Sequence, residues 1–299
     1  MPHFRLAHVS DPHLPPPDVR LGWRDVASKR LLSRIAWRRK RRRHRAEVLA
    51  ALVADVRAQA PDHVALTGDL TNFATAEEFA AARTWLESIG PPGAVTVSPG
   101  NHDALVRAPG ADPFAAWRDW LGDDAAEPFP KLRVRGEVAL INLCSAVPTA
   151  LHLAQGRLGE AQIDRLAAML REQGEAGRFR LVLVHHPVAD GAVSGRKALT
   201  DAAALRAVLA REGAELVLHG HAHEALVTRV AGPAGAIPVL GVPSASAAAD
   251  GHGEAARWHG LEIARVGDGF EIGVVARGLT GEGEFGELGR YRLTSPGRR

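Results

Sequence analysis

Short β-rich runs alternate with segments of helical spacing along most of the 299-residue chain. The pattern predicts strands over 4–9, 63–66, 94–97, 137–144, 179–184 and 215–218, and helices over 46–59, 75–89, 159–172 and 200–211. Such alternation is typical of an α/β fold. From residue 226 onward strand-like runs dominate, and the stretch 280–299, rich in glycine and charge, is expected to be partly loose. With no internal repeat and no long linker, we expect one domain over 1–299.

Composition argues against a membrane-spanning or secreted chain. No apolar run approaches the roughly 18 residues that suggest a membrane span, and the N-terminus lacks the features of a secretory signal. The single cysteine, Cys144, excludes an internal disulfide and cannot build a thiolate zinc site. We therefore expect a cytoplasmic protein with Cys144 as a small core residue.

Positive charge is concentrated in one segment. Ten Lys or Arg and no acidic residue lie between Ser28 and Arg45, whereas the rest of the chain carries 27 basic and 34 acidic groups. We interpret 21–45 as a basic helical insertion. Its apolar stripe comprises Trp23, Ala27, Leu31 and Ile35.

This insertion has three interpretations. It could lie on an anionic lipid surface or a lipid-like substrate, at the inner face of the membrane, since basic amphipathic helices with tryptophan do so. It could bind nucleic-acid phosphates, or it could be a helix packed on the core. We favour lipid contact or a structural role over nucleic acid.

Side chains able to bind a metal follow five of the predicted strands. They are Asp11 and His13, Asp69, Asn101 and His102, His185 and His186, and His219, His221 and His223. Ligand sites in α/β sheets form beyond the carboxyl ends of strands. Independent structural roles for all five clusters would require a repeated coincidence. Nitrogen and oxygen ligands without thiolate suit Mn, Fe or Zn.

Five blocks carry a family resemblance. They are Asp11-x-His13, Gly68-Asp69, Gly100-Asn101-His102-Asp103, His185-His186-Pro187 and Gly220-His221-Ala222-His223. In these blocks, and in their order, the sequence resembles the calcineurin-like metallophosphoesterase superfamily. The resemblance implies a four-layer αββα sandwich of two mixed sheets and a centre of two divalent metal ions. It further implies that Asp11, His13 and His223 bind one ion, that Asn101, His185 and His221 bind the other, and that Asp69 bridges them.

The implied reaction is hydrolysis of a phosphoester by a metal-bridging hydroxide. A metal ion can lower the pKa of bound water to about 7, which makes hydroxide available at neutral pH. In the family pattern the residue matching His102 faces the leaving oxygen, where it would act as a general acid. Asp103 would orient that ring, or alternatively cap a helix.

The substrate is less constrained by sequence. Block spacing most resembles the class III cyclic-nucleotide phosphodiesterases, which favours a phosphodiester. The alternative is a nucleotide-lipid or other nucleotide pyrophosphate at the membrane surface, favoured by the basic insertion. Arg196 and Lys197 could contact a substrate phosphate or be solvated. A non-catalytic binding module is a minor alternative, because no block has lost a ligand.

Overall fold

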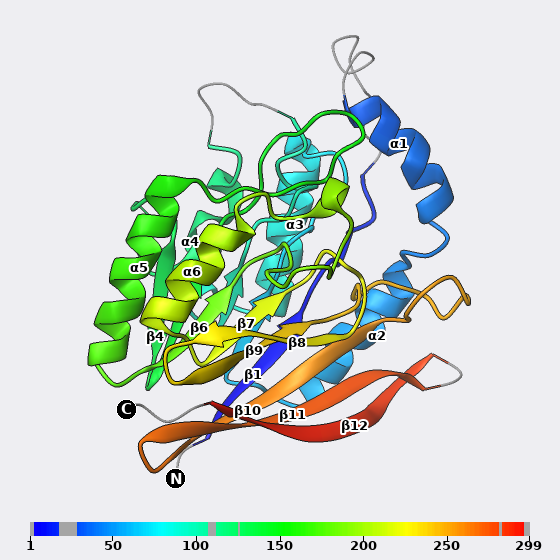
Figure 1. Cartoon of the computed structure of the whole chain (residues 1–299). Helices are drawn as coiled ribbons and strands as arrows, with labels where there is room; N and C mark the ends of the chain where they lie inside the picture. Colours follow the sequence, from blue (N-terminus) through cyan, green and yellow to red (C-terminus); the bar gives the residue numbers. More distant parts are fainter. Residues whose placement is uncertain (1–2, 18–28, 107–111, 125, 281–282, 296–299) are drawn as a thin grey trace.

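The computed structural model describes residues 3–17, 29–106, 112–124, 126–280 and 283–295. Within these ranges the chain forms two six-stranded mixed sheets with helices on their outer faces (Figure 1). The expected four-layer arrangement is confirmed.

The first sheet has the strand order β12-β11-β10-β1-β2-β3. Its strands are β1 (Phe4–Val9), β2 (His63–Leu66), β3 (Val95–Val97), β10 (Arg257–Val266), β11 (Gly269–Thr280) and β12 (Glu284–Ser295). β1, β2 and β3 are parallel, and β10 pairs antiparallel with β1. The carboxyl ends of the three parallel strands therefore meet at one edge of this sheet.

The second sheet has the order β4-β5-β6-β7-β9-β8. Its strands are β4 (Lys131–Arg135), β5 (Val138–Asn142), β6 (Phe179–Leu183), β7 (Leu216–His219), β8 (Leu226–Gly232) and β9 (Gly235–Gly241). β5, β6, β7 and β9 run parallel, with antiparallel strands at both edges. This sheet also gathers the carboxyl ends of its parallel strands at one edge.

Three apolar layers hold the sandwich together. Leu6 of β1 points into the core between the sheets, whereas its neighbour Ala7 points to the helices, as the two-residue period of a strand requires. The helices over the first sheet are α2 (Ala46–Ala58), α3 (Ala76–Ile89) and the short α4 (Arg118–Leu121). Those over the second sheet are α5 (Glu160–Glu175) and α6 (Ala202–Glu212). Short 3-10 helices lie at Pro92–Ala94, Ala115–Trp117 and Gly195–Lys197.

The predicted start of α3 is confirmed in detail. Thr75 is the N-cap: its hydroxyl accepts from the Glu78 amide, and the Glu78 carboxylate accepts from the Thr75 amide. Glu78 also accepts from the amides of Asn72 and Phe73. The capping box therefore fixes the loop that follows β2 as well as the helix itself.

The expectation of a loose C-terminal stretch is wrong for most of its length. β12 pairs antiparallel with β11 from Phe270–Ser295 to Thr280–Glu284. Its glycines and charges suit an exposed edge strand, because such side chains discourage further strand pairing. Residues 281–282 and 296–299 lie outside the described ranges.

The basic insertion is helical over residues 29–40, and residues 41–45 form a turn that leads to α2. α1 (Lys29–Lys40) stands beside the sandwich, outside the two helical layers (Figure 1). Of the predicted apolar stripe, Ile35 is 48% exposed and Leu31 is half-buried, whereas Trp23 and Ala27 lie outside the described residues. Among the described helices, none is both long and apolar enough to cross a membrane.

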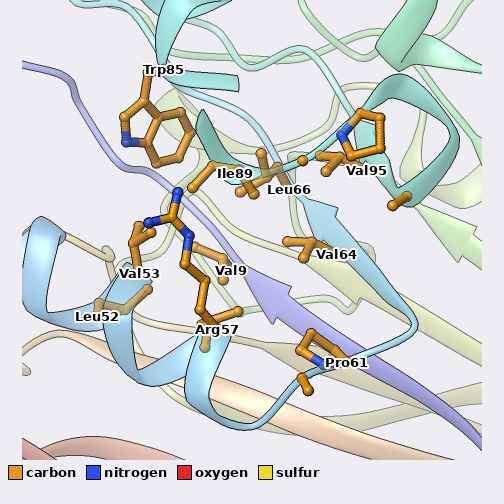
Figure 2. Close-up of a pocket in the computed structure, with 15 residues that line it drawn as sticks. Val9, Leu52, Val53, Arg57, Pro61, Val64, Leu66, Trp85, Ile89 and Val95 are labelled. Carbon is orange, nitrogen blue, oxygen red and sulfur yellow. The ribbon is translucent and has the colours of Figure 1, made fainter. Parts of the chain in front are cut away.

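An apolar hollow of about 230 Å³ lies between α2, α3 and the first sheet (Figure 2). Its lining includes Leu52, Val64, Trp85 and Ile89, and its one charged residue is Arg57, whose guanidinium donates to the Ser88 carbonyl. None of the predicted site residues lines this hollow, so the chemistry must be sought elsewhere.

Candidate metal centre

The seven predicted ligands follow the carboxyl ends of β1, β2, β3, β6 and β7, where the two sheets face one another. The loops after β1 and β2 are joined by backbone hydrogen bonds from Asp11 to Gly68 and from His13 to Asp69, both 3.0 Å. These bonds fix the spacing of the first two blocks.

Five of the seven predicted ligands adopt a left-handed backbone conformation. Their φ angles are 50° for Asp11, 42° for His13, 56° for Asp69, 66° for His221 and 58° for His223. Non-glycine residues rarely adopt positive φ, and such residues concentrate at functional sites. The local backbone is therefore shaped to turn these side chains toward one point rather than to continue a strand or helix.

The first group of side chains forms around Asp11. Its Oδ1 lies 3.0 Å from Nε2 of His223, while its Oδ2 accepts from the Ser10 hydroxyl and the His221 amide. Nε2 of His13 lies 3.4 Å from Nε2 of His223 and 3.8 Å from Oδ2 of Asp69. Two nitrogens bound to one ion at about 2.1 Å lie roughly 3–4 Å apart, so this spacing suits a shared cation.

The second group forms around His185. Its Nδ1 donates to the Thr67 carbonyl at 2.6 Å, so its Nε2 faces Oδ1 of Asn101 at 3.2 Å and Oδ2 of Asp69 at 3.5 Å. Asp69, His185 and His221 bring one ligand atom each to within 4.8 Å of the others. Asp69 also forms such a set with Asp11 and His13, so it is common to both groups.

The charges of the site call for a cation. Burial opposes a charged ring at His185, but the Asp69 and Asp11 carboxylates outweigh it and raise the pKa of His185 to about 10. A proton on this ring thus takes the place of the positive charge that the buried carboxylates require. Burial, with the adjacent His44 ring, holds the pKa of His13 well below its ordinary value, which keeps its nitrogen available to a metal. The donor set therefore fits two divalent ions.

Two motif glycines are required by close approach. A Cβ at Gly100 would collide with the Asp69 carboxylate, and a Cβ at Gly220 would collide with Ser10 and the Asp11 carboxylate. Both glycines let a ligand loop pass directly against a carboxylate.

His102 lies at the centre, but its ring is held by a different partner from the one that we expected. Its ring stands edge-on to that of His13, with 5.1 Å between ring centroids. Its Nδ1 donates to the Asn72 carbonyl at 2.9 Å. The expectation that Asp103 orients the ring is therefore corrected: a backbone carbonyl fills that role.

Asp103 instead joins two ligand loops. Its carboxylate accepts from the amides of Asp69, Thr71 and Gly100 at 2.9–3.0 Å and from the Thr71 hydroxyl. Burial and the Asp69 charge raise the pKa of Asp103 to about 7, opposed by these donors. Because both carboxylate oxygens of Asp103 are bound to these donors, Asp103 does not hydrogen-bond to the His102 ring.

Neighbouring histidines have structural partners. His186 is buried between the Ser145 hydroxyl and the Ala154 carbonyl, and Nδ1 of His219 lies 3.0 Å from the Gly220 carbonyl. These contacts give both residues structural roles beside the predicted ligand set.

The two residues predicted to contact substrate, Arg196 and Lys197, lie in different surroundings. Arg196 is exposed and donates to the His152 carbonyl. Lys197 lines the hollow over the site, and its carbonyl lies 3.0 Å from Nε2 of His221.

A groove passes the predicted ligands on two sides. One half, about 400 Å³, is lined by Arg43, Lys197, His221, His223 and His252 among others. The other half, about 270 Å³, is lined by Lys29, Trp37, Phe73, Leu105 and Leu151 among others. The two halves share His13, His44, Asn101, His102 and Ala154.

α1 forms one wall of this groove and is tied to both sides of it. Lys29 donates to the Thr149 hydroxyl and the Leu153 carbonyl, at 2.6 and 2.7 Å. Arg30 donates to the carbonyls of Phe73 and Ala74. Among the described residues of the basic insertion, α1 thus borders the site.

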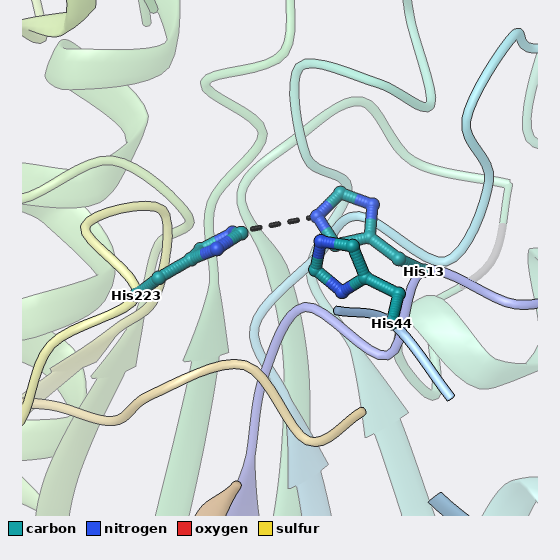
Figure 3. Close-up of side chains that lie close together, drawn as sticks. All are labelled: His13, His44 and His223. Atoms are coloured by element: carbon teal, nitrogen blue, oxygen red, sulfur yellow. Dashed lines mark hydrogen bonds between the residues drawn. The ribbon is translucent and has the colours of Figure 1, made fainter. Parts of the chain in front are cut away.

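Sequence reasoning missed His44. Its ring is buried and lies beside His13 and His223 (Figure 3), with which it forms a third set of ligand atoms within 4.8 Å. The residue sits between an arginine run and a helix, follows no strand and belongs to no block. Its position as an isolated histidine at the end of the insertion was the only available signal.

Comparison with known proteins agrees with this geometry. The sequence model of the calcineurin-like phosphoesterase family matches residues 4–225. A Synechococcus protein named as a probable cyclic nucleotide phosphodiesterase is 30% identical over 220 residues, which cover 72% of this chain and 76% of that protein.

Two solved structures share the fold. A dimetal phosphatase from Danio rerio gives a TM-score of 0.60 at 13% identity, with 99% of both chains covered. Purple acid phosphatase PPD1 from yellow lupin (Lupinus luteus) seeds gives 0.58 at 11% identity, covering 98% of this chain and 54% of that one.

Proposed function

Because the chain belongs to the calcineurin-like phosphoesterase family, we propose that it hydrolyses a phosphodiester, with cyclic nucleotides as the first substrates to test. The family makes the chain a dimetal phosphoesterase; the substrate and the residue roles are the proposal. We assign Asp11, His13 and His223 to one ion, Asn101, His185 and His221 to the other, and Asp69 to both.

The groove is the observation that carries the choice of a diester. A phosphomonoester carries carbon on one phosphate oxygen, whereas a diester, cyclic or linear, carries carbon on two. His102 and two of the predicted ligands, His13 and Asn101, line both halves of the groove, so an organic group has room on either side of them. The name of the Synechococcus relative supports cyclic nucleotides in particular.

His102 is the proposed proton donor to the leaving oxygen. A carbonyl can only accept, so the contact with Asn72 requires a hydrogen on Nδ1 of His102. The proton that the ring can transfer is then the one that Nε2 carries when the ring is a cation, and after giving it up the ring is neutral and still anchored through Nδ1. When bound, two divalent ions supply Lewis-acid stabilisation of phosphoryl oxygens and a water of lowered pKa.

The second candidate is a nucleotide-lipid pyrophosphate, and one surface favours it. Ile35 and Leu151 are 48% and 56% exposed, and they lie on α1 and on the loop to which α1 is tied. Apolar side chains beside basic residues at a groove suit an amphiphilic phosphate with an acyl chain. We propose that this edge contacts anionic lipid or the lipid part of such a substrate.

A substrate panel separates the candidates. Protein stripped with chelator and reloaded with Mn²⁺ should hydrolyse bis(p-nitrophenyl) phosphate and cyclic nucleotides faster than p-nitrophenyl phosphate. Preference for a nucleotide-lipid pyrophosphate over every diester would establish the second candidate. Preference for the monoester would contradict both.

Liposome binding tests the lipid surface directly. Vesicles with anionic lipid should sediment the wild type at low salt, and binding should fall in an Ile35→Ser, Arg41→Gln, Arg42→Gln variant. Arg229→Gln, on β8 of the second sheet, is the matched charge control. Equal sedimentation of all three proteins would leave α1 with a structural role only.

A further inference from the structure

His44 occupies a fixed position beside the metal centre. The Arg45 amide donates to the Ser246 carbonyl at 2.9 Å, and the Ala248 amide donates to the Arg43 carbonyl at 2.8 Å. These bonds flank an isolated antiparallel bridge between His44 and Ala247. The backbone therefore delivers the ring to the site from the junction of α1 and α2.

A chain of hydroxyl groups determines which ring nitrogen of His44 carries hydrogen. Ser244 donates its hydroxyl hydrogen to the Asp11 carbonyl at 2.7 Å. Its oxygen also lies 3.3 Å from Nδ1 of His44 and 3.3 Å from the Ser246 hydroxyl, which is 2.9 Å from the same Nδ1. With the Ser244 hydrogen already used, its contact with His44 is a hydrogen bond only if Nδ1 carries hydrogen.

A neutral ring in this tautomer presents a lone pair on Nε2. That nitrogen can bind a cation but cannot donate to a phosphate oxygen, which has lone pairs only. His185, a proposed ligand, is arranged in the same way, with Nδ1 donating to a carbonyl. Histidines that bind metals are commonly oriented by such a bond from their second nitrogen.

The surroundings of the ring also favour a cation. The ring centroid of His44 lies 4.5 Å from that of His13 and 5.7 Å from that of His223, and the three imidazoles lie close together in Figure 3. Trp37 of α1 stacks on the outer face of His44, at 5.7 Å and an interplanar angle of 12°. Packing and hydrogen bonding thus restrict the ring to one orientation, as a preorganised ligand requires.

We propose that His44 is a further nitrogen ligand of the ion held by Asp11, His13 and His223. The inference rests on the binuclear site proposed above. It also explains why the basic insertion lies where it does, because α1 and the turn after it carry a residue of the metal centre in addition to forming the groove wall.

Metal titration of the chelator-stripped protein tests this role without reference to activity. The wild type should bind two Co²⁺ or Mn²⁺ ions, and His44→Ala should weaken one of the two at least 10-fold and leave the other unchanged. The visible spectrum of the Co²⁺ protein should intensify in His44→Ala, because fewer ligands give stronger d–d bands. His252 lines the groove but is not a proposed ligand, so the His252→Ala variant should bind both ions with wild-type affinity.

A second variant guards against a folding defect. Ser246→Ala keeps the ring but removes an acceptor of Nδ1, so it should weaken the same ion by a smaller factor. Wild-type affinities and Co²⁺ spectra in folded His44→Ala would overturn the inference while leaving the phosphoesterase intact. Failure of the wild type itself to bind two ions would instead overturn the proposed function and this inference together.

Discussion

The carboxylate of Asp103 offers a sharp test of how the centre is held, through the substitution Asp103→Asn. The side chain keeps its size, but one oxygen becomes an amide group that donates. At present Oδ2 accepts from the Asp69 and Gly100 amides, and Oδ1 accepts from the Thr71 amide and hydroxyl. Asparagine cannot satisfy both sides, because every backbone partner is a donor.

The expected loss of stability follows from the less damaging of the two orientations of the asparagine side-chain amide. With its oxygen toward Asp69 and Gly100, asparagine keeps two bonds as neutral ones and sets its amide group against the Thr71 amide. Losing a hydrogen bond to a charged group costs about 1.5–3 kcal/mol, and the two remaining bonds weaken. We expect a loss of about 3 kcal/mol in the free energy of unfolding and a fall of roughly 5 °C in melting temperature.

The assay is denaturation in chelator together with metal titration, both at about pH 9, where Asp103, with its pKa raised to about 7, is ionised. Asp103 joins the loops that carry Asp69 and Asn101, so both ions should bind about 10–100-fold more weakly in the variant. Asp201→Asn is the matched control, since the Asp201 carboxylate accepts from the amides of Leu158 and Gly159 away from the centre. This control should be less stable than the wild type but should bind both ions with wild-type affinity. A loss of under about 0.5 kcal/mol in Asp103→Asn, against the cost expected for charged hydrogen bonds, would refute this account.

Three further outcomes are expected. Asp69→Ala should remove binuclear metal occupancy and activity together, as metal analysis and turnover would reveal; full activity would contradict the shared role. His102→Ala should keep both ions but lose about 10²–10⁴-fold in rate for esters with poor leaving groups and much less for p-nitrophenol esters, and an equal defect for both would argue against proton donation. Burial and the Arg133 charge lower the pKa of His63 to about 3, against 6.5 for an unperturbed histidine. Because the unfolded chain then binds the proton first, stability is lost as pH falls below 6.5. His63→Gln should remove about 2 kcal/mol of the stability difference between pH 7 and pH 5, and an unchanged pH profile would show that this ring is not responsible.

Strand and helix periodicity predicted the parts of the fold that the core enforces. The strands at Phe4–Val9 and His63–Leu66 match the prediction to the residue, because each is a mostly buried run rich in apolar residues. β12 was missed because an edge strand lies half in solvent and carries little apolar signal. Its pairing with β11 comes from a neighbour rather than from its own composition.

The site likewise contains residues that the sequence could predict and residues that it could not. The seven predicted ligands could be read from sequence because each follows a strand end, which the topology carries to one place. His44 could not, because its position depends on a bridge to Ala247, two hundred residues away in the chain. The partner of His102 was mistaken for a similar reason: a backbone carbonyl, at Asn72, has no sequence signature.

The two six-stranded sheets share the predicted ligands between them. Asp11, His13, Asp69 and Asn101 follow strands of the first sheet, whereas His185, His221 and His223 follow strands of the second. Each proposed ion has ligands from both sheets, so bound ions would link the two sheets at this edge. During synthesis, no partial chain can then hold a working centre before β7 has emerged and joined the second sheet. Hydrolytic activity would then require the assembled sandwich.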